Sequence, residues 1–187
     1  MNALLKAARD LQAFFESRHW GFCYIGGLAV LRWGEPRFTR DLDVTVLCPF
    51  GREDNVVGPL LQAGYGGRIP DAPEFARQNR VALLQAPSGI PIDLALGALP
   101  FEECMVERSS LFQFDPNCPL RTCSAEDLVI LKLFAFRPRD ILDAETVASR
   151  QESTFDWHYV ERNLQPLADA KEQPEIMAAL GKLRSNA

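Results

Sequence analysis

Two carboxylates stand at the start of a segment that becomes aliphatic within a few residues. Asp41 and Asp43 flank Leu42, and the chain continues as Val-Thr-Val-Leu up to Leu47. Alternate side chains of a β-strand point to the same face, so both carboxylates should face one side of a strand over residues 41–47. A strand that passes from charged to apolar residues runs from a site into a core. This segment therefore predicts a sheet with a polar site where the strand begins.

Length and composition predict one globular domain, or a core with a small appended part. The chain has 187 residues, of which 47% are hydrophobic and 24% are charged, so wholesale disorder is excluded. Its net charge of −5 excludes a protein that coats nucleic acid with a basic surface, but it does not exclude a local basic patch. The five cysteines show no Cys-x-x-Cys pair and fit reduced thiols. Because the apolar stretches are far shorter than the roughly 20 residues that span a bilayer, and no signal-peptide pattern is visible, we expect a cytoplasmic protein without a membrane partner.

The hydrophobic pattern along the chain predicts an α+β fold. An α+β part over residues 1–120 is expected to come first, and a helical part over residues 121–187 to follow. The Gly- and Pro-rich residues 64–73 are expected to form a loop. Ser124 has the chemistry of a helix N-cap, with Asp127 three residues further on. Expected helices cover 3–18, 28–33, 55–63, 101–108, 128–136, 138–149, 155–167 and 174–183, and expected strands cover 22–25, 41–47, 80–85, 90–96 and 111–114.

A third acid stands alone in an otherwise apolar strand. Asp93 lies within Ile-Pro-Ile-Asp-Leu-Ala-Leu, residues 90–96. Acids are seldom buried without a partner, so a neighbouring cation would explain this one. Carboxylate oxygens are the ligands that Mg²⁺ prefers, and two nearby like charges such as Asp41 and Asp43 repel unless a cation neutralises them. For each acid an ordinary alternative stays open, namely a strand end that faces water or, for Asp93, a pair with an arginine.

Features that suit a phosphate group come before the acids in the chain. Gly26 and Gly27 follow an expected strand and precede an expected helix, where backbone N–H groups can approach and cradle a phosphate. Arg37 and Arg40 can neutralise the negative charge of a triphosphate. Taken singly, the glycines also fit an ordinary turn and the arginines also fit solvated loop charges.

In combination, these features resemble the nucleotidyltransferases of the DNA polymerase β superfamily, and most of all its branch of AbiEii-type toxins of type IV toxin–antitoxin systems. That branch carries Gly-Gly-x-Ala, a later Gly, an arginine-rich turn and Asp-Leu-Asp at the spacing found from Gly26 to Asp43. Asp93 matches the third carboxylate of the family. The resemblance implies a nucleotidyltransferase-like mixed β-sheet core with flanking helices, followed by a helical C-terminal part.

The resemblance extends into the helical part of the chain. Residues 125–143 are similar to the family's helical signature, in which a Glu-Asp-Leu run, a lysine and two late acids recur. The lysine is Lys132, which the resemblance assigns to the triphosphate; the ordinary alternative is a lysine extending from an apolar helix to solvent. The late acids are Asp140 and Asp143. For them two roles stay open, contact with Lys132 or the helix pair, and a solvated acidic face.

The resemblance also implies a mechanism of metal-dependent nucleotidyl transfer. Asp41 and Asp43 would bind Mg²⁺ ions that bridge the triphosphate, and Asp93 would hold the second of two ions and help to deprotonate an acceptor hydroxyl. Mn²⁺ is the alternative ion. Gly26 and Gly27 would hold phosphates through their backbone amides, and the nucleotide site would also include Arg40 and Lys132, completing the expected nucleotide contacts.

The acceptor and the partners are left open by the resemblance. A nucleoside monophosphate would pass from an NTP to the 3′ end of a tRNA, or else to a protein or a small molecule such as an aminoglycoside, and an antitoxin would be the protein partner. One departure is Leu28, which stands where the superfamily has a small hydroxyl residue, so a hydroxyl contact to phosphate is missing there. Two other classes stay open: a non-catalytic nucleotide-binding or regulatory module of the same fold, and an unrelated α+β protein with surface acids.

Overall fold

The structure is a computed structural model, and it describes residues 2–151 and 154–186. The chain divides into two compact units. Unit 1 comprises Met1–Leu28 and Phe38–Cys123, and unit 2 comprises Ala29–Arg37 and Ser124–Ala187. Unit 1 contains the sheet and unit 2 is helical, so the predicted α+β class is confirmed. The short segment Ala29–Arg37 belongs to the helical unit although it lies early in the chain. Each unit is therefore made of two separate stretches of the sequence.

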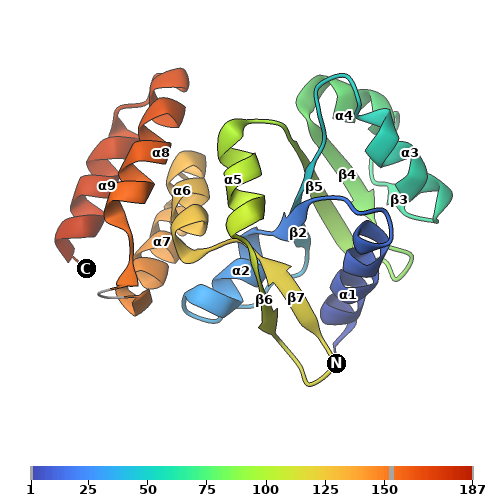
Figure 1. The fold of residues 1–187 in the computed structure, drawn as a ribbon, viewed down its shortest axis with the longest axis horizontal. Helices are drawn as coiled ribbons and strands as arrows, with labels where there is room; N and C mark the ends of the chain where they lie inside the picture. The colour runs from blue at the N-terminus through green and yellow to red at the C-terminus, as the bar shows by residue number, and fades with distance from the viewer. Residues whose placement is uncertain (1, 152–153, 187) are drawn as a thin grey trace. The chain divides into compact units, whose positions relative to one another are not determined.

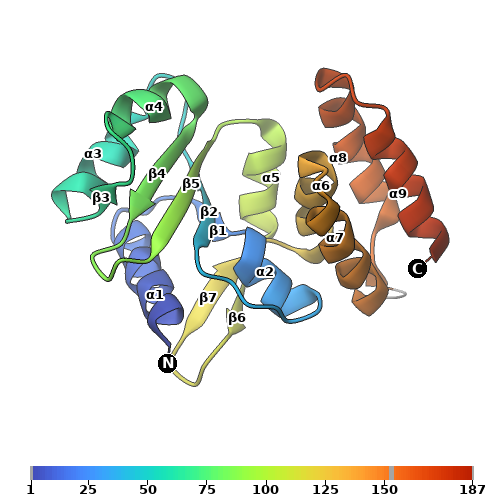
Figure 2. The same ribbon diagram turned by 180° about the vertical axis from the view of Figure 1, so that it is seen from behind.

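Unit 1 is built on a mixed sheet, and the described strands follow the order β3-β4-β5-β2-β1-β7-β6 (Figures 1 and 2). β2 runs parallel to β5 and antiparallel to β1, while β4 and β5, close to the strands expected over 80–85 and 90–96, form an antiparallel hairpin. The strands are β1 (Phe22–Tyr24), β2 (Leu42–Leu47), β3 (Gly66–Gly67), β4 (Val81–Gln85), β5 (Pro91–Gly97), β6 (Ser110–Gln113) and β7 (Pro119–Thr122).

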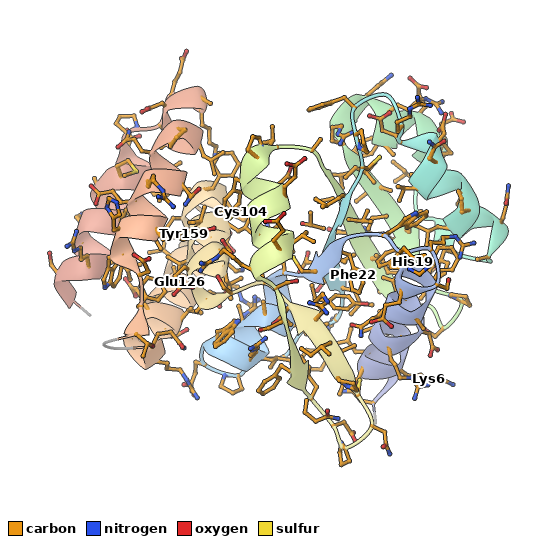
Figure 3. All side chains as sticks on the ribbon, in the orientation of Figure 1. Lys6, His19, Phe22, Cys104, Glu126 and Tyr159 are labelled. Atoms are coloured by element: carbon orange, nitrogen blue, oxygen red, sulfur yellow. The ribbon has the colours of Figure 1, made fainter. Side chains whose placement is uncertain are left out.

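One face of this sheet is the apolar core of unit 1. Helix α1 (Ala3–Glu16) covers it, because Phe15 packs on Phe22 with ring centroids 5.1 Å apart and the Tyr24 hydroxyl donates to the Ala8 carbonyl at 2.5 Å. Phe22 is labelled on β1 in Figure 3. Residues of β2 and β5 that share this face are fully or almost fully buried, namely Leu42, Val44, Val46, Ile92, Leu94 and Leu96.

The opposite face of the sheet carries the acids. Helix α5 (Pro100–Arg108) packs on β1 and β2 and covers this face near Thr45 and Gly97, where a side chain on Gly97 would collide with Thr45 and Glu102. Two further helices of unit 1, α3 (Asp54–Gln62) and α4 (Ala72–Asn79), contact each other, and α4 lies along β4. The start of β2, with Asp43, lies on the face that α5 covers, because Asp43 and Thr45 are two residues apart on one strand.

Unit 2 consists of helices packed around α6. Helix α6 (Ala125–Ala135) is apolar on all sides and contacts α7 (Pro138–Gln151), α8 (Trp157–Ala170) and α9 (Glu175–Asn186). A helix that is hydrophobic all round belongs in the centre of a bundle. As predicted, Ser124 caps it, since its Oγ accepts a hydrogen bond from the Asp127 N–H at 3.1 Å. Helix α2 (Gly26–Trp33) begins in unit 1 and continues into unit 2.

The described structure contains elements that the sequence pattern did not predict. Residues 64–73 were expected to be a loop, yet they contain β3 and the first turn of α4. β3 is a pair of glycines with little strand preference, and it exists because it pairs with Leu84 and Gln85. Helix α4 is short, and left-handed residues at Asp71 and Arg80 mark its two ends. None of the helices that the structure describes has both the length and the apolar character needed to cross a lipid bilayer.

Candidate active site

The parallel pairing of β2 and β5 places two acids side by side. Asp43 on β2 is the register partner of Asp93 on β5. Register partners on parallel strands point to the same face, and neighbouring strands lie about 4.8 Å apart. Their neighbours Leu42 and Ile92 are also register partners and are both 0% exposed on the other face, in the core. Burial of these aliphatic residues therefore sets the face on which the carboxylates lie.

The remaining acid, Asp41, directly precedes β2. Asp41 lies two residues before Asp43, and its carboxylate Oδ1 accepts a hydrogen bond of 3.0 Å from the Thr39 hydroxyl. All three carboxylates are neither fully buried nor fully exposed. Asp43 and Asp93 thus lie side by side in unit 1, near the start of β2 and of β5, and Asp41 lies two residues before Asp43 in the chain.

Gly26 and Gly27 pass close to this group and leave no room for a side chain. A Cβ on Gly26, whose φ is +54°, would lie 1.9 Å from Asp43 Oδ2, and a Cβ on Gly27 would lie 2.3 Å from Thr39 Oγ1. The Gly27 N–H donates to Asp43 Oδ2 at 3.3 Å. Glycine is thus required at both positions for the chain to approach Asp43 and Thr39 this closely. The expected contact of these amides with phosphate stays a prediction.

Asp93 has a cationic partner. The Arg68 guanidinium forms an ion pair with the Asp93 carboxylate, and the exposed fractions of the two side chains are 29% and 43%. Arg68 lies directly after β3, and its backbone N–H donates to the Leu83 carbonyl at 2.9 Å. Sequence reasoning did not find Arg68, because a single arginine in a Gly- and Pro-rich segment carries no periodic signal. It did keep an arginine pair open for Asp93.

The two predicted basic contacts to nucleotide, Arg40 and Lys132, have different local surroundings. Arg40 is exposed, and its guanidinium carbon lies 5.3 Å from the ring centroid of Phe38, which is itself 76% exposed. Lys132 belongs to unit 2, where its ammonium nitrogen lies 2.7 Å from Asp140 Oδ1 and 2.8 Å from Asp143 Oδ2. Of the two roles left open for the late acids, contact with Lys132 is the one that is observed.

Asp143 also binds Arg37, which completes a cluster of two cations and two anions in unit 2. Arg37 Nε and Nη2 donate to the two carboxylate oxygens of Asp143 at 3.0 and 2.9 Å. Burial acts to raise the pKa of Asp143, but the hydrogen bonds and charges of Arg37 and Lys132 more than offset it and hold this pKa below its usual value. Arg37 was expected to neutralise a triphosphate or to be a solvated loop charge. In the structure its guanidinium pairs with the Asp143 carboxylate.

A family described as the nucleotidyl transferase AbiEii toxin of type IV toxin–antitoxin systems matches residues 11–177. The matched range contains the three acids, both glycines and the cluster around Lys132. The chain belongs to the AbiEii family. Nucleotidyl transfer is therefore its class of activity, and the resemblance inferred from the sequence motifs is confirmed.

Solved structures agree with the fold of this AbiEii-family chain. An antigenic nucleotidyltransferase-like protein from Paracoccidioides brasiliensis aligns with a TM-score of 0.54 at 16% identity, covering 95% of this chain and 91% of that one. Lincosamide antibiotic adenylyltransferase LnuA, lincomycin-bound, aligns with a TM-score of 0.52 at 15% identity, covering 83% and 100%. Antibiotic-resistance factor ANT(2'')-Ia aligns with a TM-score of 0.53 at 13% identity, covering 98% and 97%. These likenesses show the nucleotidyltransferase fold. A search of curated proteins found no match.

The donor set of the AbiEii-family chain can be compared with what a divalent cation requires. Carboxylate oxygens are the hard ligands that Mg²⁺ prefers, and Asp43 and Asp93 are neighbours on one face of the sheet. Yet nowhere in residues 2–151 and 154–186 do three or more His, Cys, Asp or Glu side chains converge closely enough to hold an ion. The Arg68 guanidinium holds the Asp93 carboxylate. The two neighbouring carboxylates have the oxygen donors that suit a divalent cation, but they do not form a complete ion site as they stand, and an ion would have to compete with Arg68 for Asp93.

Proposed function

We propose that this AbiEii-family chain transfers a nucleoside monophosphate from an NTP to an acceptor hydroxyl, with Asp41, Asp43 and Asp93 as its catalytic residues. The observation that carries the proposal is the register of β2 and β5, which makes Asp43 and Asp93 direct neighbours on one sheet face. Asp41 lies two residues before Asp43, immediately before β2 begins at Leu42, and would complete the set of acids. In the reaction, the acceptor oxygen forms a bond to the α-phosphorus, and the bond from that phosphorus to the pyrophosphate oxygen breaks.

The proposed roles of the acids follow from their surroundings. Asp41, Asp43 and Asp93 would hold two Mg²⁺ ions, or Mn²⁺, which when bound neutralise phosphate charge and stabilise the attacking and leaving oxygens. Asp93, whose side chain is 43% exposed, would take up the proton of the acceptor hydroxyl. The Gly27 N–H orients Asp43, and the Thr39 hydroxyl orients Asp41.

The proposed nucleotide contacts are Gly26, Gly27, Arg40 and Lys132. Gly26 and Gly27 are the first residues of α2, and backbone N–H groups at a helix N-terminus would hold a phosphate. Arg40 is an exposed cation one residue before Asp41, so its guanidinium can pair with a phosphate oxygen. Lys132 carries three N–H donors, of which two serve Asp140 and Asp143, and the third can serve a phosphate oxygen.

The proposed acceptor is the 3′ end of a tRNA, in the cytoplasm, with an antitoxin protein as the partner that the family's place in type IV systems implies. A small-molecule acceptor is the second candidate. It is favoured by one observation, that two solved structures of the same fold are a lincosamide adenylyltransferase and an antibiotic-resistance factor. The net charge of −5 gives no separate support to either acceptor.

The test is a labelling reaction with each α-³²P NTP, Mg²⁺ and total tRNA, run in parallel with an aminoglycoside and a lincosamide in place of tRNA. We expect label on the tRNA for the wild-type protein and a loss of at least about a hundredfold for Asp41→Ala. Asp54→Asn is the matched control, since Asp54 is an exposed acid of unit 1 that pairs with Arg77. Label on a small molecule alone would move the acceptor to the second candidate, and no transfer to any acceptor would contradict the proposal.

A further inference from the structure

Arg68 is held on the same side of the sheet as the proposed catalytic acids. Its N–H donates to the Leu83 carbonyl at 2.9 Å, and Leu83 on β4 is the register partner of Asp93 on β5. The backbone of Arg68 is thus fixed two strand spacings from Asp93, within reach of a fully extended arginine. Its Nη2 pairs with Asp93 and also lies 3.4 Å from the Ile92 carbonyl. The guanidinium therefore lies against β5, beside the third acid.

This ion pair contributes little to the stability of the fold. Both side chains are partly exposed, at 29% for Arg68 and 43% for Asp93, and pairs of that kind are screened by water and salt. The core below the pair, including Ile92 and Leu94, is already completed by aliphatic residues that are 0% exposed. A contact of this kind can exchange for another without unfolding the strand.

The main effect of the Arg68–Asp93 pair is on the negative charge of the proposed catalytic acids, not on the stability of the fold. Asp43 and Asp93 place two negative charges side by side on one sheet face, with Asp41 two residues before Asp43 in the chain, and neighbouring like charges repel. Arg68 supplies a positive charge at Asp93. A divalent cation needs the oxygens of that same carboxylate, so cation and guanidinium compete for one ligand.

We propose that Arg68 is a positioning residue that neutralises Asp93 while no cation is bound and releases it when a divalent cation and an NTP bind. This inference rests on the proposed function. After release, the guanidinium stays on the same face, because its backbone remains bonded to Leu83. A planar guanidinium binds phosphate oxygens in pairs, so the freed side chain then pairs with the triphosphate.

The proposal predicts effects of opposite sign for two ligands. Removing the guanidinium frees Asp93, so Arg68→Gln should bind Mn²⁺ more tightly than wild type, by roughly two- to fivefold. The same variant lacks the phosphate partner, so it should bind ATP more weakly in the presence of saturating Mn²⁺. A purely structural role for Arg68 would weaken both ligands together. Arg68→Lys keeps the charge but not the planar fork, and should fall between wild type and Arg68→Gln for Mn²⁺.

The experiment measures Mn²⁺ binding to the full chain by the loss of the free-ion signal in electron paramagnetic resonance. Wild type, Arg68→Gln, Asp93→Asn and the double variant are compared, with circular dichroism melts to confirm folding. Arg77→Gln is the matched control, because Arg77 is another partly exposed arginine of unit 1 that pairs with acids, here Asp54 and Glu74. ATP affinity is measured at saturating Mn²⁺ by isothermal titration calorimetry.

The expected result is a gain in Mn²⁺ affinity for Arg68→Gln that disappears when Asp93 is also replaced and that Arg77→Gln does not share. Equal or weaker Mn²⁺ binding by Arg68→Gln overturns the proposal, as does an equal gain in Arg77→Gln or a lack of Mn²⁺ binding by all variants. Unchanged ATP affinity overturns the phosphate role. If the Mn²⁺ gain is found but wild type labels no acceptor, Arg68 acts as proposed and the proposed function is what fails.

Discussion

The guanidinium of Arg37 donates two hydrogen bonds to the carboxylate of Asp143, which lies 106 residues later in the chain. Asp143 is in addition bonded by Lys132, which also binds Asp140. Arg37 lies four residues before Asp41, so this pair limits the freedom of the chain that leads into the first proposed catalytic acid. A second arginine–carboxylate contact, between Arg68 and Asp93, involves one of the three proposed catalytic acids directly.

Arg37→Ala should destabilise the protein. The side chain of Asp143 is 7% exposed and that of Arg37 24%, so the substitution leaves a buried carboxylate with one of its two cations. We expect a loss of about 2–4 kcal/mol in the free energy of unfolding, measured by urea titration. Arg150→Ala is the control, because its pair with Glu35 is exposed, and it should change stability by less than about 1 kcal/mol. Equal effects of the two variants would show that the Arg37 pair is no stronger than a surface pair.

Stability should fall in acid partly because of Asp143. Its pKa is lowered in the folded protein, since Arg37 and Lys132 outweigh the opposing effect of burial. A carboxyl with a lowered folded pKa stabilises the fold above its unfolded pKa of about 3.9, and this contribution is lost as the pH falls through the folded value. Urea titrations below pH 5 should therefore show a smaller decline for Asp143→Asn than for wild type. Asp54→Asn, a change at an exposed acid, should follow the wild-type slope, and parallel curves for all three proteins would contradict the role of Asp143.

Gly26→Ala should disturb the acids as well as the backbone. The added Cβ would lie 1.9 Å from Asp43 Oδ2, and the backbone of Gly26 is left-handed with φ +54°. We expect a loss of about 2–4 kcal/mol in the free energy of unfolding and a loss of nucleotidyl transfer. Gly51→Ala separates the two causes, because Gly51 has φ +76° with no atom near its Cβ position. It should cost only about 1 kcal/mol, measured by the same urea titration, and it should leave transfer unchanged. If the two variants lose equal stability, the clash with Asp43 is relieved by movement of that side chain.

Tyr159→Phe should lower the stability of unit 2 and leave nucleotidyl transfer unchanged. The Tyr159 hydroxyl, on the residue labelled in Figure 3, donates to Asp127 Oδ1 at 2.7 Å, and Asp127 is 0% exposed. The other carboxylate oxygen of Asp127, Oδ2, accepts a hydrogen bond from Ser124 Oγ at 2.7 Å. Loss of one donor to a buried carboxylate should cost about 1–3 kcal/mol, read from thermal and urea unfolding. Transfer at a temperature where the variant is folded should be unchanged, and a selective loss of transfer would assign Tyr159 a role beyond stability.

Local patterns in the sequence determined several of these features by themselves. The run of charged and then aliphatic residues over 41–47 predicted β2 (Leu42–Leu47), and Ser124 caps α6 because its hydroxyl lies within reach of an N–H three residues later. The apolar run over residues 128–136 predicted the helix that is observed as α6 (Ala125–Ala135). The motif from Gly26 to Asp43 was specific enough to indicate the family. Each of these depends on residues close together in the chain, where backbone sterics and short-range hydrogen bonds set the geometry.

Contacts between distant segments were decided by the tertiary structure alone. Asp93 became the neighbour of Asp43 through the parallel pairing of β2 and β5, and its partner Arg68 comes from a segment that was expected to be a loop. Arg37 and Lys132, both expected to bind nucleotide, meet at Asp143. The sequence shows which side chains are charged, whereas the partner of each charge depends on which strands and helices pack together. That packing is driven by burial of the apolar faces, and those faces carry no information about the charges on the other side.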